Sequence, residues 1–555
     1  MKMNKVKNIA VLLAAALLTM ACNKFLDKMP DNRTEIDNQD KIRALLVSAY
    51  NSNTYLKFSE YMSDNVDNIG DDNPGTNRFV EQCYHWEDIT EIANDCPTYF
   101  WSDSYLAIAH ANQALLAIQE LSGCEDELDP EAVEAAGLAP EMAEALLCRA
   151  YAHFMLVNFF CQNYNAETSD KDLGVPYMKG IETHLNPQYE RGTVAGVYKN
   201  IEEDLEIALK YVSESYYKIP KYHFNVRAAY AFAARFYLFY EKWDKAEACA
   251  TRCLGSNPAQ KLRNWQARAS MPHDMDVLSN DFILSKYDAN IMLMTAYTNF
   301  GYEFGNPGLS KFSHNSFLSF TEVSYAKNVW GNPQSGWGNV SSWYWDPPVW
   351  YNGSTFDQIA FWKIPYLFEY TDPVNGIGYH RAVFPAFTTD ETLLTRAEAR
   401  VMQHKYDEAA ADLNIWAHNI IKPSYFSGTL TPESIKAFYS AVAYWTPDVP
   451  TIKKHLNPAF FIGEENEMME SMLQCVLGFK RIDHVAQGLR WLDIKRYGIE
   501  ITRRTLQPDP AAGQYDAAFK ILDGQVDILT KDDPRRALQI PQDVVSAGLE
   551  PNPRN

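Results

Sequence analysis

The side chains best suited to ligand chemistry in this sequence are aromatic, and many of them gather in one segment. Six of the thirteen tryptophans lie between residues 330 and 362. A flat aromatic ring can stack on the C–H face of a sugar with little loss of side-chain freedom, while neighbouring amides hydrogen-bond its hydroxyl groups. The candidate ligand-binding residues are Trp337, Trp343, Tyr344, Trp345, Trp350, Tyr351 and Asn339. We expect Trp343 and Trp345 to face solvent or a groove; the alternative is that these rings fill a small loop-rich core.

Cys22 is a second residue with its own chemistry. Three lysines precede an apolar run over residues 9–20, and Ala21 stands directly before the cysteine. This order is typical of a secretory signal, and a thiol at the first mature position can be linked to diacylglycerol. The apolar run is too short for a membrane-spanning helix, which needs about 20 residues. We therefore predict a lipoprotein signal peptide over residues 1–21 and lipidation at Cys22; the alternative is an ordinary cleaved signal with a chance cysteine.

The negative charge of the chain argues against nucleic acid as a binding partner. Asp and Glu number 71 against 50 Lys and Arg, so the formal net charge is -21 at pH 7. Proteins that bind nucleic acid usually present a basic surface. For the same reason we do not expect the protein surface itself to adsorb onto anionic lipid.

Sequence motifs of common enzymes are missing from the chain. It has no Gly-x-Ser-x-Gly elbow, no His-Glu-x-x-His pair, no phosphate-binding glycine loop and no dinucleotide fingerprint. No Cys/His cluster has the spacing of a zinc site. We expect a binding protein without metal or cofactor. A glycosidase is the less favoured alternative, because its paired carboxylates need to be close only in space.

Residues 59–99 form an irregular segment rich in acidic side chains. Counted from Asp71, the ligand and glycine positions of an EF-hand loop hold Gly75 and Thr76, and the final position holds Gln82 instead of glutamate. We therefore interpret the acidic stretch 64–73 as a solvated loop; the alternatives are a loop that contacts ligand and an irregular metal site. The segment also carries Cys83 and Cys96, the one pair that we would test for a disulfide.

The elements that must position these residues are mainly helices. Apolar residues recur every three or four positions through most of the chain outside residues 256–387. One pair of expected helices fits the spacing of a tetratricopeptide repeat, at Tyr230, Ala234, Tyr237, Trp243, Ala246, Ala250 and Pro258. A weaker match runs from Ala397 to Ala409. Because the two matches lie far apart in the chain, we expect a large insert between them.

These patterns predict a mostly α fold, with a tetratricopeptide-like helical-repeat scaffold and a large loop-rich aromatic insert. After the signal peptide, the predicted regions are a lipidated N-terminal segment with the first helix (22–58), an N-terminal helical-repeat region (59–255), the aromatic insert as candidate ligand face (256–387) and a C-terminal region (388–555).

Several motifs, in order along the chain, resemble the SusD/RagB family, the surface glycan-binding lipoproteins of Bacteroidetes nutrient-uptake systems. Residues 22–30 are similar to the family's Cys-x-Lys-Phe-Leu-Asp opening, and residues 143–154 to its Glu-Ala-x-x-x-Arg-Ala-x-x-Tyr-Phe helix. Residues 174–177, Gly-Val-Pro-Tyr, follow where the family places a Gly-x-Val-Pro turn, and residues 488–498 resemble its Gly-x-Arg-Trp-x-Asp-Leu-x-Arg signature. Two features depart from the pattern: Lys480-Arg481 replaces the usual Glu-Arg pair, and the common Gln-Asn-Pro-Gly ending is absent.

The resemblance implies an outer-membrane lipoprotein that faces the exterior, captures oligosaccharides and delivers them to a SusC-like TonB-dependent transporter. It implies binding and release without catalysis. The insert has no recognisable family match, so the resemblance does not name the glycan. A peptide-binding uptake lipoprotein of the same architecture is the alternative.

The resemblance also implies a structural role for the C-terminal signature, Gly488, Arg490, Trp491, Asp493 and Arg496. On a helix, Asp493 and Arg496 are neighbours at i,i+3 and can form an ion pair. We expect Trp491 to turn to a different face of that helix.

Overall fold

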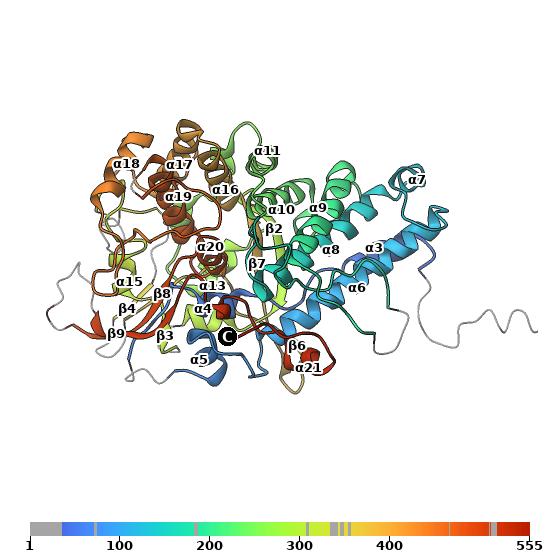
Figure 1. Cartoon of the computed structure of the whole chain (residues 1–555), viewed down its shortest axis with the longest axis horizontal. Coiled ribbons are helices and arrows are strands. Elements are labelled where there is room, and N and C mark those ends of the chain that lie inside the picture. Colours follow the sequence, from blue (N-terminus) through green and yellow to red (C-terminus); the bar gives the residue numbers. More distant parts are fainter. Residues whose placement is uncertain are drawn as a thin grey trace, which may run out of the picture.

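The computed structural model of the chain describes residues 36–555, except 71–74, 183–186, 307–309, 333–341, 345–348, 353–356, 466, 510, 512–518 and 555. Its long helices are α6 (Pro97–Leu121), α8 (Ala139–Phe160), α9 (Val194–Tyr211), α10 (Val226–Phe239), α11 (Trp243–Leu254), α16 (Thr389–Met402), α17 (Tyr406–Ile420) and α19 (Met468–His484). They follow one another across the molecule, from α6, α8 and α9 on one side through α10 and α11 to α16, α17 and α19 on the other (Figure 1). The predicted mostly helical, tetratricopeptide-like fold is confirmed.

Short helices connect and cover this array. They are α3 (Gln39–Leu46), α4 (Leu56–Met62), α5 (Arg78–Tyr84), α7 (Pro130–Ala135), α12 (Trp265–Arg268), α13 (Met275–Phe282), α14 (Phe300–Gly305), α15 (Ser316–Thr321), α18 (Pro432–Ala441), α20 (Arg490–Arg496) and α21 (Gln542–Ser546). Among the residues that the structure describes, the 3-10 turns η1 (Pro220–Tyr222), η2 (Pro258–Lys261) and η4 (Pro534–Arg536) each begin at a proline.

Several helices begin where the sequence supplies a capping side chain. The side chain of Thr193 accepts a hydrogen bond from the Gly196 N–H at the start of α9, and Asn225 does the same for Ala228 at the start of α10. Each cap satisfies a backbone donor that a helix start leaves unpaired, which stabilises the helix by about 1 kcal/mol. By contrast, α8 is buried on all sides, which places it at the centre of the helical layer.

The two hairpins that match the repeat spacing, α10–α11 and α16–α17, are direct neighbours although the insert separates them in sequence. Helix α11 packs against α16. Glu247 of α11 pairs with Arg400 Nε of α16 at 2.9 Å and with Lys405, just before α17, at 2.5 Å. Arg235 of α10 pairs with Glu391 of α16 at 2.6 Å. The chain therefore leaves the helical stack after α11 and rejoins it at α16.

The described strands form three small sheets. Antiparallel β2 (Asn290–Tyr297), β7 (Ile377–Thr388) and β6 (Leu367–Asp372) make one sheet in that order. A second has the order β3 (Phe312–Ser313), β1 (Asp67–Asn68), β8 (Ile501–Pro508) and β9 (Phe519–Leu529), and β4 (Val349–Asn352) pairs with β5 (Asp357–Ala360). Strand β7 leads directly into α16, because Thr388 is both its last residue and the N-cap of that helix.

The predictions for the N-terminal part of the chain concern the signal peptide, Cys22 and the pair Cys83 and Cys96. The signal peptide 1–21 and Cys22 lie outside the described residues. Within the residues that are described, no helix is both long enough and apolar enough to span a bilayer. Cys83 and Cys96 are both buried and are free thiols in the structure.

Candidate functional site

The aromatic cluster predicted from the sequence is only partly described. Trp337, Asn339 and Trp345 lie outside the described residues, and Trp350 and Tyr351 belong to β4 but their side chains are not described. No conclusion about a ligand platform follows from these five residues, and their role stays a prediction.

The expectation that Trp343 faces solvent or a groove is wrong. Its side chain is 1% exposed, and its ring lies 5.5 Å from that of Trp330, edge to face. The backbone explains this placement, since the N–H of the half-buried Tyr344 donates to the carbonyl of Ile420 at 2.7 Å and the N–H of Lys422 donates to that of Ser342 at 2.9 Å. Residues 342–344 thus run along the end of α17, and the indole points into the core.

The C-terminal signature is buried and structural in its contacts. Trp491 is fully buried, and Asp493 pairs with Arg496 at 3.2 Å as predicted. Lys480, which departs from the family pattern, lies 2.9 Å from both Asp493 and Glu398. A lysine at this position therefore bridges two buried carboxylates on different helices. Gly488 has a φ of 68°, a conformation that favours glycine.

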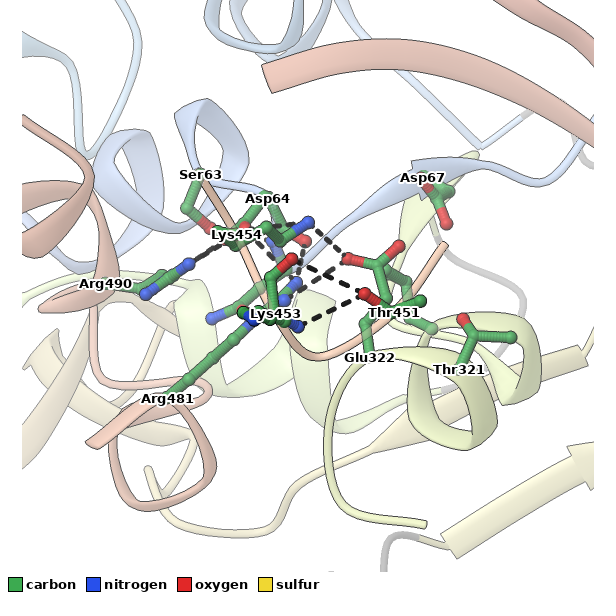
Figure 2. A network of polar contacts seen from close by, with 12 residues as sticks. Ser63, Asp64, Asp67, Thr321, Glu322, Thr451, Lys453, Lys454, Arg481 and Arg490 are labelled. Atoms are coloured by element: carbon green, nitrogen blue, oxygen red, sulfur yellow. Dashed lines mark hydrogen bonds and ion pairs between the residues drawn. The ribbon is translucent and has the colours of Figure 1, made fainter. Parts of the chain in front are cut away.

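The acidic stretch is not the solvated loop that we expected, at least at Asp64 and Asp67. Both are buried, and Asp64 accepts hydrogen bonds from Arg490 Nε and Nη2 at 2.8 and 3.0 Å. Figure 2 shows Arg481 and Lys454 approaching the same carboxylate. Burial acts to raise the pKa of Asp64, but the positive charges of Arg481 and Arg490 outweigh it and hold the pKa well below its usual range.

Glu322 extends this buried network into the middle of the sequence. It pairs with Lys454 at 2.7 Å and with Arg504 at 2.7 Å, and Arg504 also pairs with Asp67 at 2.9 Å. The network joins residues 64 and 67, residue 322, and several residues between 454 and 504, which are three parts of the chain far apart in sequence (Figure 2). Every charge in it faces an opposite charge, so its contacts indicate a structural role.

A group of partly exposed aromatic rings lies elsewhere in the insert, on the β6–β7 hairpin, just before it and on α14. We call it the hairpin surface; it consists of Tyr302, Tyr366, Phe368, Tyr370 and His380. Tyr302 is 39%, Phe368 37% and Tyr370 58% exposed. The rings follow one another, with centroid distances of 4.7 Å from Tyr302 to Tyr366, 4.5 Å from Tyr366 to His380, 5.0 Å from His380 to Phe368 and 4.8 Å from Phe368 to Tyr370.

Strand geometry explains how these rings come to share one face. Phe368 pairs with His380 and Tyr370 pairs with Gly378 across the hairpin, and residues two apart on a strand point to the same side. Because Gly378 has no side chain, it does not cover the ring of Tyr370 on the opposite strand. A Cβ at Gly378 would lie 2.0 Å from the carbonyl oxygen of Glu369 and 2.7 Å from the Phe368 ring, so no larger residue fits without a shift of the strand.

Sequence reasoning missed this surface although a signal was present. Before the turn at residues 373–376, aromatic residues stand at every second position, at Tyr366, Phe368 and Tyr370. The turn itself ends in Asn375-Gly376, a typical hairpin signal. Tryptophan density directed attention to residues 330–362 instead. The hairpin surface can do what a sugar-binding platform requires, since it offers several rigid aromatic rings that are partly open to solvent.

Comparison with known proteins agrees with this fold. Residues 24–238 match a SusD-like family described as starch-binding and associating with the outer membrane. A putative sugar-binding protein from Bacteroides vulgatus has 17% identity and a TM-score of 0.60, with 94% of this chain and 99% of that chain covered. A SusD superfamily protein from the same organism has 18% identity and a TM-score of 0.56 over 92% and 97% of the two chains. No curated protein matches the chain.

The fold is thus the fold of SusD superfamily structures over nearly the whole chain. The resemblance found in the sequence is thus confirmed at two levels: residues 24–238 match the SusD-like family, and the described chain has the fold of SusD superfamily structures.

Proposed function

We propose that this protein is a carbohydrate-binding lipoprotein of the outer membrane. In this proposal it captures oligosaccharides or polysaccharides on its outward-facing side and passes them to a SusC-like TonB-dependent transporter, without making or breaking a covalent bond. The description of the matched family as starch-binding and outer-membrane-associated supports the proposal. So does the sugar-binding name of a structural neighbour.

The observation that carries the proposal for this particular chain is the hairpin surface. Glycan chains present alternating C–H faces and hydroxyl edges, and a row of rings about 5 Å apart can contact such faces at successive positions. Hydrogen-bonding groups for the hydroxyls stand at the rim, where Asp372 and Asn375 form the hairpin turn.

Attachment to the membrane is proposed to depend on Cys22. Each buried acyl CH₂ is worth about 0.8 kcal/mol, and one acyl chain alone gives only weak attachment, so stable anchoring takes at least two. A modified Cys22 with two or three chains would hold the protein beside its transporter while the ligand is exchanged.

Affinity electrophoresis tests the proposal. The protein without its signal peptide is run through gels that contain soluble starch, xylan, mannan, levan or no polysaccharide. We expect at least one polysaccharide to retard the protein, and the double variant Phe368→Ala/Tyr370→Ala to migrate as in the empty gel. Truncating one well-packed contact aromatic costs more than about 1 kcal/mol, a roughly fivefold loss of affinity per ring.

The matched control is Tyr425→Ala, which removes a ring that is 38% exposed outside the hairpin surface. Retardation that persists in the double variant would refute the site, and binding of a peptide library without any glycan would favour the peptide-binding alternative. Release of reducing sugar from a retained glycan would instead indicate a glycosidase.

A further inference from the structure

A cavity of about 450 Å³ lies between the segment that follows α3, helix α6 and strand β2. Its volume falls within the range of small-molecule sites. Arg381 of β7 lines one side of it. Because successive residues of a strand point to opposite faces, Arg381 and His380 lie on opposite faces of the hairpin, and the cavity is separate from the hairpin surface.

A histidine backed by a buried carboxylate lines this cavity. His223 Nδ1 lies 2.7 Å from Glu144 Oε1, and Glu144 is only 1% exposed. Tyr50 and Tyr216 donate their hydroxyl hydrogens to the same carboxylate. We assign the hydrogen of the imidazole to Nδ1, because the Glu144 carboxylate can accept a hydrogen bond from it there. Nε2, on the opposite edge of the His223 ring, is then left as a hydrogen-bond acceptor. The ring plane is held by Tyr217, stacked at 4.4 Å with an interplanar angle of 8°.

Asp103 and Arg381 bring further hydrogen-bonding groups to the cavity. One oxygen of Asp103, Oδ2, accepts hydrogen bonds from Ser52 and from Asn53, both at 2.5 Å. Its other oxygen, Oδ1, accepts none from the residues that the structure describes. Arg381 donates to Glu369 through Nη1, while its Nε is buried without a partner among the described residues. The cavity thus offers a carboxylate acceptor, an imidazole acceptor and a guanidinium donor, each held in place by neighbours.

The charges of these groups indicate a neutral ligand. Glu369 offsets Arg381, Glu144 lies against His223, and Asp103 accepts from the neutral side chains of Ser52 and Asn53. His110 is the other imidazole of the lining, and its Nδ1 lies 2.8 Å from the carbonyl oxygen of Ser48. With no excess of positive charge, an acidic sugar or a phosphate would be repelled. Hydroxyl groups, by contrast, can donate to the two acceptors and accept from the guanidinium. The ring of Tyr222, which is half-buried at the edge of the cavity, adds an apolar contact.

We propose that this cavity is a second ligand site, for one or two neutral sugar residues, in which Glu144 positions His223 and Asp103 binds hydroxyl groups directly. The proposal rests on the carbohydrate-binding function proposed above, and it assigns short sugars to the cavity and polymers to the hairpin surface.

Isothermal titration calorimetry tests this with the full chain lacking only the signal peptide. The probes are glucose, galactose, mannose, xylose, maltose and cellobiose, with glucuronate and the dipeptide alanyl-alanine as chemically different ligands. We expect at least one neutral sugar to bind, and Thr295→Trp and Asp103→Asn to weaken it at least tenfold. Thr295 is an exposed lining residue of β2, so a tryptophan there fills the cavity without entering the core.

Two controls separate the cavity from the rest of the molecule. Leu522→Trp adds the same ring at a position of β9 that is 61% exposed. Asp126→Asn removes an exposed carboxylate in the segment that follows α6. Both variants should bind the sugar as the wild type does. The variant Phe368→Ala/Tyr370→Ala should keep short-sugar binding, while Thr295→Trp should keep retardation by polysaccharide.

The inference is overturned if no neutral sugar binds, if the cavity variants bind as tightly as the wild type, or if only glucuronate or alanyl-alanine binds. Retardation by polysaccharide that survives in any of these cases shows that the cavity proposal alone has failed. If the wild type binds neither a short sugar nor a polysaccharide, the proposed function has failed as well.

Discussion

At the scale of single residues, the burial of Trp343 turns a candidate binding group into part of the core. Its indole packs against Trp330, which in turn lies 5.0 Å from Phe479 of α19. The ring therefore connects the insert to the C-terminal helices. We therefore expect the Trp343 side chain to stabilise the fold and not to contact the ligand.

The variant Trp343→Ala should lower the free energy of unfolding by about 3–5 kcal/mol, because it removes a large buried side chain and leaves a cavity. Urea denaturation followed by circular dichroism measures this change. The exposed Tyr425→Ala should change stability by less than about 0.5 kcal/mol. A Trp343→Ala protein with unaltered stability but lost glycan binding would restore the original interpretation of the ring as a ligand contact.

Asp95 offers a second prediction at this scale, in which the pH dependence has a definite sign. Burial raises the pKa of Asp95 to about 6, against an opposing effect of Lys57. In the unfolded chain an aspartate ionises near pH 4. Between these values the unfolded state loses its proton first, so the contribution of Asp95 to the free energy of unfolding falls as pH rises from about 4 to about 6 and stays constant above.

The variant Asp95→Asn removes this titration, and asparagine tolerates the φ of 67° at this position. We expect it to match the wild type near pH 4 and to exceed it by about 1–3 kcal/mol at pH 8. Urea denaturation at pH 4, 6 and 8 gives the difference at each pH. Asp126→Asn, at an exposed position, should show no such trend, and a difference for Asp95→Asn that is independent of pH would contradict the argument.

At the scale of elements, the β6–β7 hairpin carries the proposed binding surface because of its register. The pairing of Tyr370 with Gly378 leaves one ring without a cross-strand neighbour, and the same glycine lets the two strands approach. The turn is stabilised by Asp372, which accepts hydrogen bonds from the N–H groups of Val374 and Asn375, both at 3.1 Å. The direction of the rings therefore depends on the hairpin as a unit.

The variant Gly378→Ala should disturb this hairpin, since its Cβ would collide with the Glu369 carbonyl. We expect retardation by polysaccharide to fall at least fivefold while the thermal transition of the helical layer shifts by only a few degrees. Gly180→Ala is the matched control, because a Cβ at Gly180 meets no atom within 4 Å. Equal binding by Gly378→Ala and wild type would show that the hairpin register is unimportant for the ligand.

At the scale of the whole molecule, contacts between distant parts of the sequence hold the chain together. Arg503, from β8, donates to the carbonyls of Tyr61 and Ser63, both at 2.8 Å. Near the end of the chain, Asn552 donates to the carbonyl of Phe160 at the end of α8 at 2.8 Å. The first and last described parts of the chain are thus packed against each other, and the strand order β1–β8–β9 continues the same contact.

Retention at the membrane is the prediction that belongs to this scale. The variant Cys22→Ala has no thiol to carry acyl chains and should appear in the soluble fraction of cells, whereas the wild type should sediment with outer membranes. Labelling with a radioactive fatty acid provides the direct measurement, with label expected on the wild type alone. Unlabelled wild-type protein in the soluble fraction would refute the tether, and equal stability of the two purified proteins would show that folding does not depend on it.

The sequence alone was enough to establish the helical scaffold and the resemblance to SusD-like proteins. Helix periodicity, caps such as Thr193, and the spacing of small residues around Ala246 are local properties, because they depend on residues a few positions apart. The i,i+3 pair of Asp493 and Arg496 could be predicted for the same reason. Composition predicted an insert over residues 256–387, and the chain leaves the helical stack after α11 and rejoins it at α16.

Only the tertiary structure decided which aromatic and acidic residues are buried. Trp343 and Tyr370 are both aromatic residues of the insert, yet one is 1% and the other 58% exposed, since the first lies beside the end of α17 and the second beside a glycine of a neighbouring strand. Asp64 became a buried ion-pair partner because Arg490, more than four hundred residues later, lies next to it. Burial and charge pairing depend on long-range packing, which no short sequence window contains, and this packing also created the cavity beside His223.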